Sequence, residues 1–370
     1  MHIVWFSWKD INHPEAGGAE AVSDQIRKRL VKDGHSVTLI TAKYPDSKHE
    51  EVVDGVKVIR TGGRYTVYVR AKSAYRIIGS DADIIIDEMN TIPFTPFRYT
   101  KNIPVVLLTY QLARSVWFYQ LPLPLSLIGY LVEPIYLKVM SKKYETIITE
   151  SNSTKNDLIK FGFIADRIKV FRVGITTLRP TSLHSKKSIN NILFLGSLRP
   201  MKRPIDAIKA FEFARDTQPN IRLVIAGGGK GSYANKVTKY AKQSRHSAAI
   251  ELKGRVEEAE KRILLEGSGV ILVTSIKEGW GLIVTEANCH GTPAIVYDTD
   301  GLRDSVQDDI TGKIVSNGDP LSMGESLVNL INDKDMYNKL SLEAYNQSKQ
   351  YTSDNSYNDF VQAIGIKLNK

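Results

Sequence analysis

The sequence predicts an α/β protein made of two doubly wound parallel-sheet domains that face each other across a cleft. First, its 370 residues exceed the roughly 100–200 of one ordinary domain. Second, short β-branched runs alternate with amphipathic helical stretches, which is typical of parallel sheets joined by crossover helices. Third, a polar stretch over residues 177–190 separates two such series, and we expect it to be the linker.

The expected strands follow one another at regular intervals in both halves. Between the first two, Ala19, Val22, Ile26 and Leu30 recur at helical spacing before Gly34, which indicates a helix ended by a glycine. The strands of the first half are expected at 3–6, 36–41, 56–59, 84–87, 105–109, 146–149 and 168–171. Those of the second half are expected at 191–195, 222–226, 250–252, 270–274, 294–297 and 313–315. We therefore expect a first domain over 1–178 and a second over 179–354.

The composition is that of an ordinary globular protein. Apolar residues make up 42% of the chain and charged residues 24%, which excludes disordered, collagen-like and coiled-coil classes. The single cysteine, Cys289, excludes an internal disulfide and any multi-cysteine metal site, so we expect a cytoplasmic protein. The first residues are typical of a buried strand rather than a secretion signal, and no apolar run reaches the length of about 18 residues that a membrane span needs.

The net charge of +10 raises the question of an anionic partner. The basic excess is spread over both halves without a basic block or an arginine-rich arm, which argues against nucleic acid. Contact with an anionic membrane is the better interpretation. The apolar stretch from Trp117 to Met140, followed by Lys142 and Lys143, would suit a membrane interface at the inner face, and ordinary core packing is the alternative.

Paired glycines lie in the loop that follows the first expected strand. Gly17 and Gly18 come directly before the first expected helix. Glycines allow backbone N–H groups to approach a ligand closely, and a helix N-terminus favours an anion such as a diphosphate. The alternative is a simple glycine-rich turn. The spacing is not that of the dinucleotide motif Gly-x-Gly-x-x-Gly, so a dehydrogenase is disfavoured.

A stronger motif follows the expected strand 270–274. Gly279 and Gly281 open a turn, and a helix is expected to run from there to Gly291. Glu278 then lies in the loop and Glu286 lies one to two turns inside the helix, so the two carboxylates would hold different parts of one ligand. The backbone amides of 280–282 would lie at the helix N-terminus, where a phosphate binds. Two solvated glutamates are the alternative.

The pattern Glu-Gly-Trp-Gly-Leu-x3-Glu over 278–286 resembles the Glu-x7-Glu signature of retaining glycosyltransferases of family 4, which have the GT-B fold. The resemblance covers nearly the whole chain. Further segments that occur in the family's order are 17–20, 196–202, 227–229, 254–256, 301–306 and 311–312.

The resemblance implies two Rossmann-like domains, with a nucleotide-sugar donor held mainly by the second and the acceptor mainly by the first. By resemblance, Glu286 would bind the ribose, Glu278 the hydroxyls of the donor sugar, and Lys202 the diphosphate. A lysine there places a cation where negative charge develops on the leaving group. The C-terminal segment 355–370 would pack back on the first domain.

The remaining donor contacts implied by the resemblance are mostly backbone groups. The amides of Gly279, Trp280, Gly281 and Leu282, together with the first-domain glycines Gly17 and Gly18, would contact the diphosphate or the sugar. Gly254, Arg255 and Val256 would lie near the base. Lysine and helix dipoles would replace a divalent metal, and no Asp-x-Asp motif lies near the expected site. The pairs Asp81/Asp83 and Asp298/Asp300 have the spacing, but we expect strand-edge and loop roles for them.

The chain departs from the family at two places. Ser197 occupies the position where many members have an arginine. Either Arg199 or Arg203 supplies the missing positive charge, or the site binds the diphosphate more weakly. Tyr110 stands where many members place a histidine near the sugar and acceptor. A tyrosine can donate a hydrogen bond, but its free pKa near 10 makes it a poor base at neutral pH.

The resemblance implies a retaining, metal-independent enzyme without a cofactor that moves a hexose from a uridine or guanosine diphosphate sugar to a hydroxyl of a glycan or lipid-linked glycan. The catalytic residues are expected to be Glu278, Lys202 and Tyr110. The acceptor side is expected to include Tyr110, Gln111, Arg114 and Trp117. Two alternatives stay open at this point: a catalytically weak or non-catalytic nucleotide-sugar-binding subunit, and a sugar-nucleotide epimerase or hydrolase of the same architecture.

Overall fold

The chain divides into two compact units. The computed structural model describes residues 1–78, 81–100, 102–175, 177, 179–180, 183 and 189–366. The first unit comprises Met1–Gly174 and Thr352–Lys370, and the second comprises Ile175–Tyr351. The breaks expected from the sequence lie within a few residues of this division. The linker expected over 177–190 lies largely outside the described residues.

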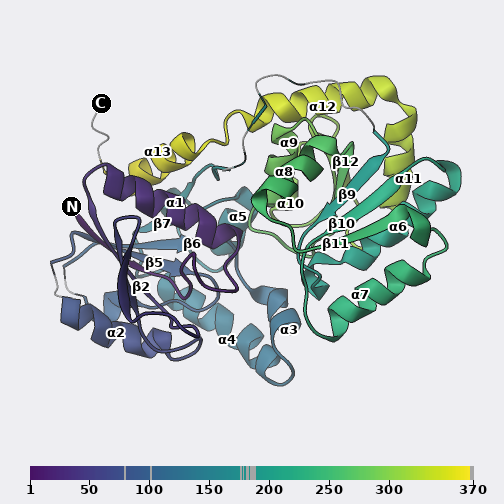
Figure 1. The fold of residues 1–370 in the computed structure, drawn as a ribbon. Helices are drawn as coiled ribbons and strands as arrows, with labels where there is room; N and C mark the ends of the chain where they lie inside the picture. Colours follow the sequence, from purple (N-terminus) through teal and green to yellow (C-terminus); the bar gives the residue numbers. More distant parts are fainter. Residues whose placement is uncertain are drawn as a thin grey trace. The chain divides into compact units, whose positions relative to one another are not determined.

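The first unit is built on an 8-stranded sheet in the order β3-β4-β2-β1-β5-β6-β7-β8, parallel except for the β3–β4 pair (Figure 1). Its strands are β1 (His2–Phe6), β2 (Ser36–Thr41), β3 (Glu50–Val53), β4 (Val56–Arg60), β5 (Ile84–Met89), β6 (Val105–Thr109), β7 (Thr146–Thr149) and β8 (Ile168–Val170). Its α-helices are α1 (Gly18–Lys32), α2 (Val67–Ile78), α3 (Trp117–Gln120), α4 (Leu125–Met140), α5 (Asn152–Lys160) and α13 (Ser353–Ala363). Every strand expected in this half is present.

The antiparallel edge strand β3 was not expected from the sequence. It forms a two-residue hairpin with β4, because Asp54 and Gly55 both have positive φ angles of 48° and 82°. That pair of angles is typical of the type I′ turn that Asp-Gly favours. The Asp-Gly pair between valines was therefore the signal for β3, although the strand itself, Glu-Glu-Val-Val, is short and half polar.

The helices of the first unit lie on both faces of the sheet. Ile85 packs in one cluster with residues of α2, and Leu107 packs in another with Leu137 and Met140 of α4. Ile85 is the register partner of Val105, two residues before Leu107, so all three side chains point to one face. α2 and α4 therefore cover the same face. α1 and α13 lie together on the opposite face (Figure 1).

The C-terminal helix α13 is an integral part of the first unit. The ring of Phe360 is fully buried and stacks on Trp5 of β1, with ring centroids 5.5 Å apart. Phe171, which follows β8, makes a T-shaped contact with the same ring, and the two ring centroids lie 6.3 Å apart. The guanidinium of Arg172 donates to both carboxylate oxygens of Asp359, at 2.7 and 2.6 Å. These contacts join the last helix to the centre and edge of the sheet.

The second unit is a 6-stranded, all-parallel sheet in the order β11-β10-β9-β12-β13-β14. Its strands are β9 (Asn191–Leu195), β10 (Arg222–Ala226), β11 (Ile250–Gly254), β12 (Val270–Val273), β13 (Ala294–Tyr297) and β14 (Gly312–Val315). Its α-helices are α6 (Pro204–Thr217), α7 (Ser232–Gln243), α8 (Glu258–Gly267), α9 (Leu282–Cys289), α10 (Leu302–Ser305), α11 (Pro320–Asn332) and α12 (Lys334–Ser348). All six expected strands are present.

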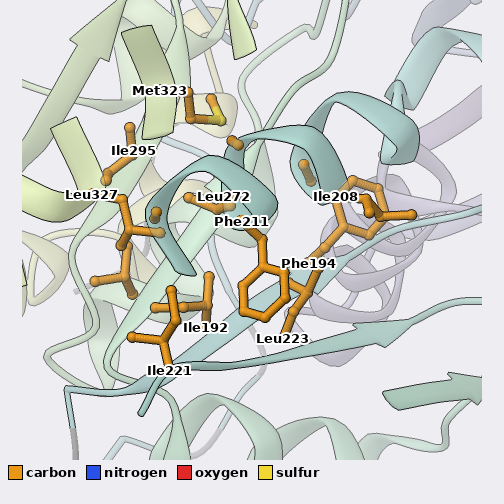
Figure 2. Close-up of a cluster of buried hydrophobic side chains, with 14 of the residues drawn as sticks. Ile192, Phe194, Ile208, Phe211, Ile221, Leu223, Leu272, Ile295, Met323 and Leu327 are labelled. Atoms are coloured by element: carbon orange, nitrogen blue, oxygen red, sulfur yellow. The ribbon is translucent and has the colours of Figure 1, made fainter. Parts of the chain in front are cut away.

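A core of buried apolar side chains fills one face of this sheet, beneath α6 and α11. Figure 2 shows Phe211 of α6 among Ile192, Leu223 and Leu272 of the strands, with Met323 and Leu327 of α11 beside Ile295. The expected fold class, two α/β units with parallel sheets, is confirmed. No helix in the described part of the chain has both the length and the apolar character that would let it cross a membrane.

Candidate functional site

The strand order of the second sheet places the loops after β9 and β12 side by side. From β9 the chain proceeds outward through β10 and β11, and it returns to the other side of β9 with β12. The carboxyl ends of β9 and β12 therefore flank the point where the strand order reverses, which is where doubly wound sheets bind ligands. The loop after β9 carries Lys202, and the loop after β12 carries Glu278. Their side chains form an ion pair between Nζ and Oε1.

Hydrogen bonds from the neighbouring loop hold Lys202 in place. The buried Thr274 hydroxyl donates to the backbone carbonyls of Lys202, at 2.7 Å, and Arg203, at 2.9 Å. The N–H of Ile276 donates to the carbonyl of Met201 at 2.9 Å. On the carboxylate side, the Ser275 hydroxyl donates to Glu278 Oε1 at 2.6 Å. The cation and the carboxylate are thus held by the backbone and by short side chains, which is how a preorganised site is built.

Two glycines bring the Glu278 loop against its neighbour and into the next helix. A Cβ on Gly301 would lie 2.3 Å from the carbonyl oxygen of Glu278, so only glycine permits this approach. Gly281 has a φ of 88° and directly precedes α9. The backbone amides from Gly279 to Leu282 consequently lie at the N-terminal end of α9, as expected.

Glu286 is held by a lysine that the sequence did not indicate. Lys261 of α8 forms an ion pair with Glu286, with Nζ 2.9 Å from Oε1. Burial raises the pKa of Glu286 above its ordinary value, and the charge of Lys261 opposes that rise. Lys261 also contacts Glu258 at 2.7 Å. In the described structure each glutamate of the Glu-x7-Glu pattern is therefore paired with a lysine.

The Trp280 side chain packs within the second unit. Its indole Nε1 donates to the Thr285 hydroxyl at 2.8 Å, and its ring lies 5.2 Å from that of Tyr351. The ring is largely buried.

Close glycine contacts also join the loops after β9, β10 and β11. A Cβ on Gly227 would lie 1.9 Å from the carbonyl oxygen of Gly196, and the Gly227 N–H donates to the carbonyl of Gly254 at 2.6 Å. Arg199 is exposed and its Nε donates to the Ser197 hydroxyl at 2.8 Å. Gly254 has a φ of 71°, Arg255 is exposed and Val256 packs on the core. These residues all lie at the carboxyl edge of the second sheet.

In the first unit a glutamate and a lysine hold the loop that precedes α1 and contains Gly17. Glu20, in the first turn of α1, accepts the N–H of Gly17 at 2.7 Å and pairs with Lys9, whose Nζ lies 3.1 Å from Oε1. Lys9 also donates to the carbonyl of Glu15 at 2.8 Å. Gly18 is the first residue of α1. The glutamate three positions after Gly17 was the available signal, since that spacing is typical of a capping interaction.

Tyr110 lies below the surface, directly after β6. Its ring is 4% exposed, and its hydroxyl lies 2.6 Å from the Ser23 hydroxyl of α1. Burial raises the pKa of Tyr110 far above its ordinary value, so the phenol stays protonated at neutral pH. The hydroxyl is thus engaged within the unit. The catalytic role expected for Tyr110 stays a prediction.

Two other residues expected on the acceptor side, Arg114 and Trp117, lie against a buried carboxylate. Glu133 of α4 accepts the backbone N–H groups of Ala113, at 2.8 Å, and Arg114, at 2.6 Å, and the Nε1 of Trp117 at 2.9 Å. The Arg114 guanidinium lies over the Tyr130 ring, 4.3 Å from its centroid. The backbone carbonyl of the half-buried Gln111 accepts the Thr109 hydroxyl at 3.4 Å. This segment is fixed by Glu133, which the sequence did not single out.

Both halves of the chain match known family models. Residues 16–179 match the model described as glycosyltransferase family 4, and residues 178–347 match the one described as glycosyl transferases group 1. The chain belongs to glycosyltransferase family 4. The expected family is confirmed.

Among its curated relatives, the D-inositol 3-phosphate glycosyltransferase of Salinispora tropica is 26% identical over 47% of this chain and 38% of its own length. The poly(glycerol-phosphate) alpha-glucosyltransferase of Bacillus subtilis is 26% identical over 50% of this chain and 27% of its own length. The chain thus spans less than half the length of these two relatives.

The fold is similar to that of solved glycosyltransferase structures. Sucrose-phosphate synthase from Thermosynechococcus elongatus superposes with a TM-score of 0.80 at 16% identity, covering 98% of both chains. Anabaena HepE in complex with UDP and glucose superposes with a TM-score of 0.73 at 14% identity, covering 98% of this chain and 99% of that one. The expected GT-B fold is confirmed.

The Asp-x-Asp pairs of this family-4 glycosyltransferase are engaged in contacts within their units. Asp83 accepts the His2 N–H at 2.7 Å, and Asp81 lies 3.1 Å from the His2 ring nitrogen. Arg303 contacts Asp298 at 2.8 Å and Asp300 at 2.6 Å. Among the described residues, no three His, Cys, Asp or Glu side chains come close enough together to hold a metal ion.

Two buried carboxylates lie at the end of β5 in this family-4 chain. Glu88 accepts the Trp5 Nε1 at 2.6 Å and has Arg27 Nη1 at 3.7 Å; burial raises its pKa to about 7. Asp87 accepts the N–H groups of Phe94 and Thr95, each at 3.0 Å, and burial raises its pKa to about 6. The folded state therefore binds protons that the unfolded state has already released.

The free energy of unfolding is accordingly expected to fall as the pH rises from about 4.5 toward 7, because the folded chain holds more protons in that window. Glu88→Gln keeps an acceptor for Trp5 but removes one titrating group. We expect the free energy of unfolding of this variant to fall less across the window than that of wild type. The difference should be about 1.4 kcal/mol for each unit by which folding raises the pKa of Glu88. Urea unfolding at several pH values measures this difference, with the exposed Glu145→Gln as control. Equal pH slopes for wild type and Glu88→Gln would refute the role of Glu88.

Proposed function

We propose that this chain transfers a hexose, with retention of anomeric configuration, from a uridine or guanosine diphosphate sugar to a hydroxyl of a glycan or lipid-linked glycan. The observation that carries the proposal is the Lys202–Glu278 pair at the point where the strand order of the second sheet reverses. Glu286 and the N-terminus of α9 lie in the same loop-helix segment. Together they supply groups suited to a diphosphate, a sugar and a ribose.

Each group of the second unit has a distinct role in this proposal. Lys202 binds the diphosphate, Glu278 accepts hydrogen bonds from hydroxyls of the sugar, and Glu286 accepts those of the ribose. The amides from Gly279 to Leu282 bind phosphate or sugar oxygens, since a helix N-terminus presents N–H groups to anions. Donor binding exchanges the two lysine–carboxylate pairs for contacts with the ligand. The ligand thereby takes the place of the ion-pair partners, so Lys202, Glu278 and Glu286 each keep a partner in the donor complex.

The proposed chemistry needs electrostatic stabilisation and orientation rather than a nucleophilic side chain. As the bond from the anomeric carbon to the donor phosphate breaks, negative charge grows on the diphosphate, and Lys202 and the α9 amides stabilise it. The acceptor hydroxyl attacks from the same face and passes its proton to a phosphate oxygen of the leaving group. No protein base is required, which fits a Tyr110 that is buried and protonated.

The names of similar proteins narrow the substrates that deserve a first test. HepE was solved with UDP-glucose, so UDP sugars come first, with GDP sugars beside them. The relatives are named for inositol 3-phosphate and poly(glycerol-phosphate) acceptors, both of which carry hydroxyls next to phosphate. We propose that the acceptor of this chain is reached at the inner face of a membrane.

Thermal melting of the full chain with a panel of nucleoside diphosphates and their sugars tests the donor site. A ligand that binds only the folded state, at about 100 times its Kd, adds about 2.7 kcal/mol and raises the melting temperature by several degrees. We expect one base to produce this shift. Glu286→Ala and Glu286→Gln should both lose it, whereas the exposed Glu325→Ala on α11 should keep it. Loss of the shift in Glu325→Ala as well, or its retention in both Glu286 variants, would contradict the ribose role.

A non-catalytic nucleotide-sugar-binding subunit is the second candidate, and the uncharged Ser197 in the loop after β9 is the observation that favours it. In that case the diphosphate site holds one fixed cation, Lys202, beside an uncharged serine. Release of nucleoside diphosphate from the sugar donor separates the candidates. An enzyme releases it faster with acceptor, a hydrolase or epimerase turns over without acceptor, and a binding subunit shifts the melting temperature but releases nothing.

A further inference from the structure

The helix α4 has its apolar side outward. Its buried positions include Ser126 and Glu133 besides Leu137 and Met140. Its exposed side is apolar at nearly every position, with Ile135 65% and Leu131 58% exposed. The other exposed apolar residues of this helix and of the turn before it are Leu123, Leu125, Leu127, Ile128, Val132 and Val139. A surface helix in water ordinarily shows the reverse arrangement.

Polar anchors and close packing fix this orientation. Glu133, which points inward, accepts three N–H groups, from Ala113, Arg114 and Trp117. Rotating α4 to bury its leucines would break these three hydrogen bonds and leave the N–H donors without their acceptor. Gly129 lies directly against the Trp117 ring, since a Cβ there would lie 2.6 Å from ring carbons. The outward apolar side is therefore a stable feature of the first unit.

Basic side chains accompany the apolar surface. Lys138, Lys142 and Lys143, at the end of α4, are exposed, and residues 117–143 contain no acidic residue besides the buried Glu133. The helix α2, on the same face of the sheet, contains no acidic residue at all. Its exposed side chains include the apolar Val69 and Ile77 and the basic Arg70, Lys72 and Arg76.

We propose that the face formed by α2 and α4 docks on an anionic lipid bilayer, with the exposed side of α4 inserted at the interface between headgroups and acyl chains. An apolar stripe bordered by cations is the pattern that binds such surfaces. A second copy of the chain fits less well, because a two-fold contact would bring like charges on α2 and α4 together. This docking surface rests on the proposed function for its membrane-bound acceptor. Binding to vesicles, however, is measured without donor or acceptor.

Vesicle co-sedimentation of the full chain tests the proposal, using phosphatidylcholine vesicles with and without phosphatidylglycerol. We expect binding to the anionic vesicles that weakens with salt. Binding to the neutral vesicles should be weaker by at least about tenfold. The double variant Leu131→Asp/Ile135→Asp should lose binding to both. Lys142→Glu/Lys143→Glu should lose mainly the preference for anionic lipid. Leu342→Asp, an exposed apolar position of α12 in the second unit, should bind like wild type.

Three outcomes would overturn the proposal. These are no binding of wild type to anionic vesicles, wild-type binding by the Leu131→Asp/Ile135→Asp variant, or a dimer that this variant dissociates without any vesicle binding. The nucleotide-induced melting shift, measured on the same variants, shows that they fold and keeps the two proposals apart. A shift without vesicle binding refutes only the docking surface, and vesicle binding without a shift refutes only the donor site.

Discussion

Replacing Lys202 by methionine is expected to lower kcat by about two to three orders of magnitude, the loss that follows removal of one preorganised group facing developing charge. The methionine keeps most of the side-chain volume but removes the cation that pairs with Glu278 at the end of β12. Because Thr274 and Ile276 bind backbone atoms of this loop, its conformation should survive the substitution. The expected loss is therefore chemical rather than structural. Initial rates of nucleoside diphosphate release at saturating donor measure it.

The matched control is Lys242→Met, an exposed lysine of α7 in the same unit, which should leave kcat unchanged. Lys202→Arg should recover part of the rate, since it restores a cation with a longer reach. A Lys202→Met variant that keeps more than about a tenth of the wild-type kcat would contradict the role of Lys202 in leaving-group stabilisation. A similar loss in Lys242→Met would show that the assay reports stability instead.

Replacing Phe360 by alanine is expected to destabilise the first unit by about 3–5 kcal/mol, the usual cost of truncating a buried aromatic side chain. The ring is fully buried between Trp5 and Phe171, so its removal leaves a cavity between α13 and the sheet. Urea unfolding followed by tryptophan fluorescence measures the loss. We expect it to appear as a lower midpoint of the transition.

Phe360→Leu serves as the control, because it refills most of the cavity and should cost less than half as much as Phe360→Ala. The nucleotide-induced melting shift should survive in both variants, since the groups that we propose to bind the nucleotide lie in the second unit. A cost below about 1 kcal/mol for Phe360→Ala would mean that α13 is dispensable for the first unit.

The parallel strands could be predicted because a strand buried on both faces is a continuous apolar run, as Ile84-Ile85-Ile86 is. The edge strand β3 could not be found in that way, because one of its faces is solvated and its residues alternate in exposure. The Asp54-Gly55 turn was its better signal. Continuous apolar runs thus predict the central strands, whereas the residues of the turn predict the edge strand.

Within the candidate site, spacing was informative only where the residues lie in one segment, and Lys202 was assigned to the site by the family resemblance. Glu278 and Glu286 share a loop and a helix, so their spacing was readable. Lys261 pairs with Glu286 across 25 positions and from another helix, and only the folded packing of α8 against α9 brings them together. For α4, composition predicted an apolar helix, but which side faces the protein depends on Glu133 and its three donors. Such long-range pairings leave no periodic trace in a sequence.

A crystal structure of the full chain bound to the diphosphate or sugar nucleotide that gives the largest melting shift tests the central claim most directly. We expect diphosphate oxygens within hydrogen-bond distance of Lys202 Nζ and of the amides preceding α9, and ribose hydroxyls on the carboxylate of Glu286. Nucleotide bound elsewhere, with the Lys202–Glu278 and Lys261–Glu286 pairs intact, would contradict it.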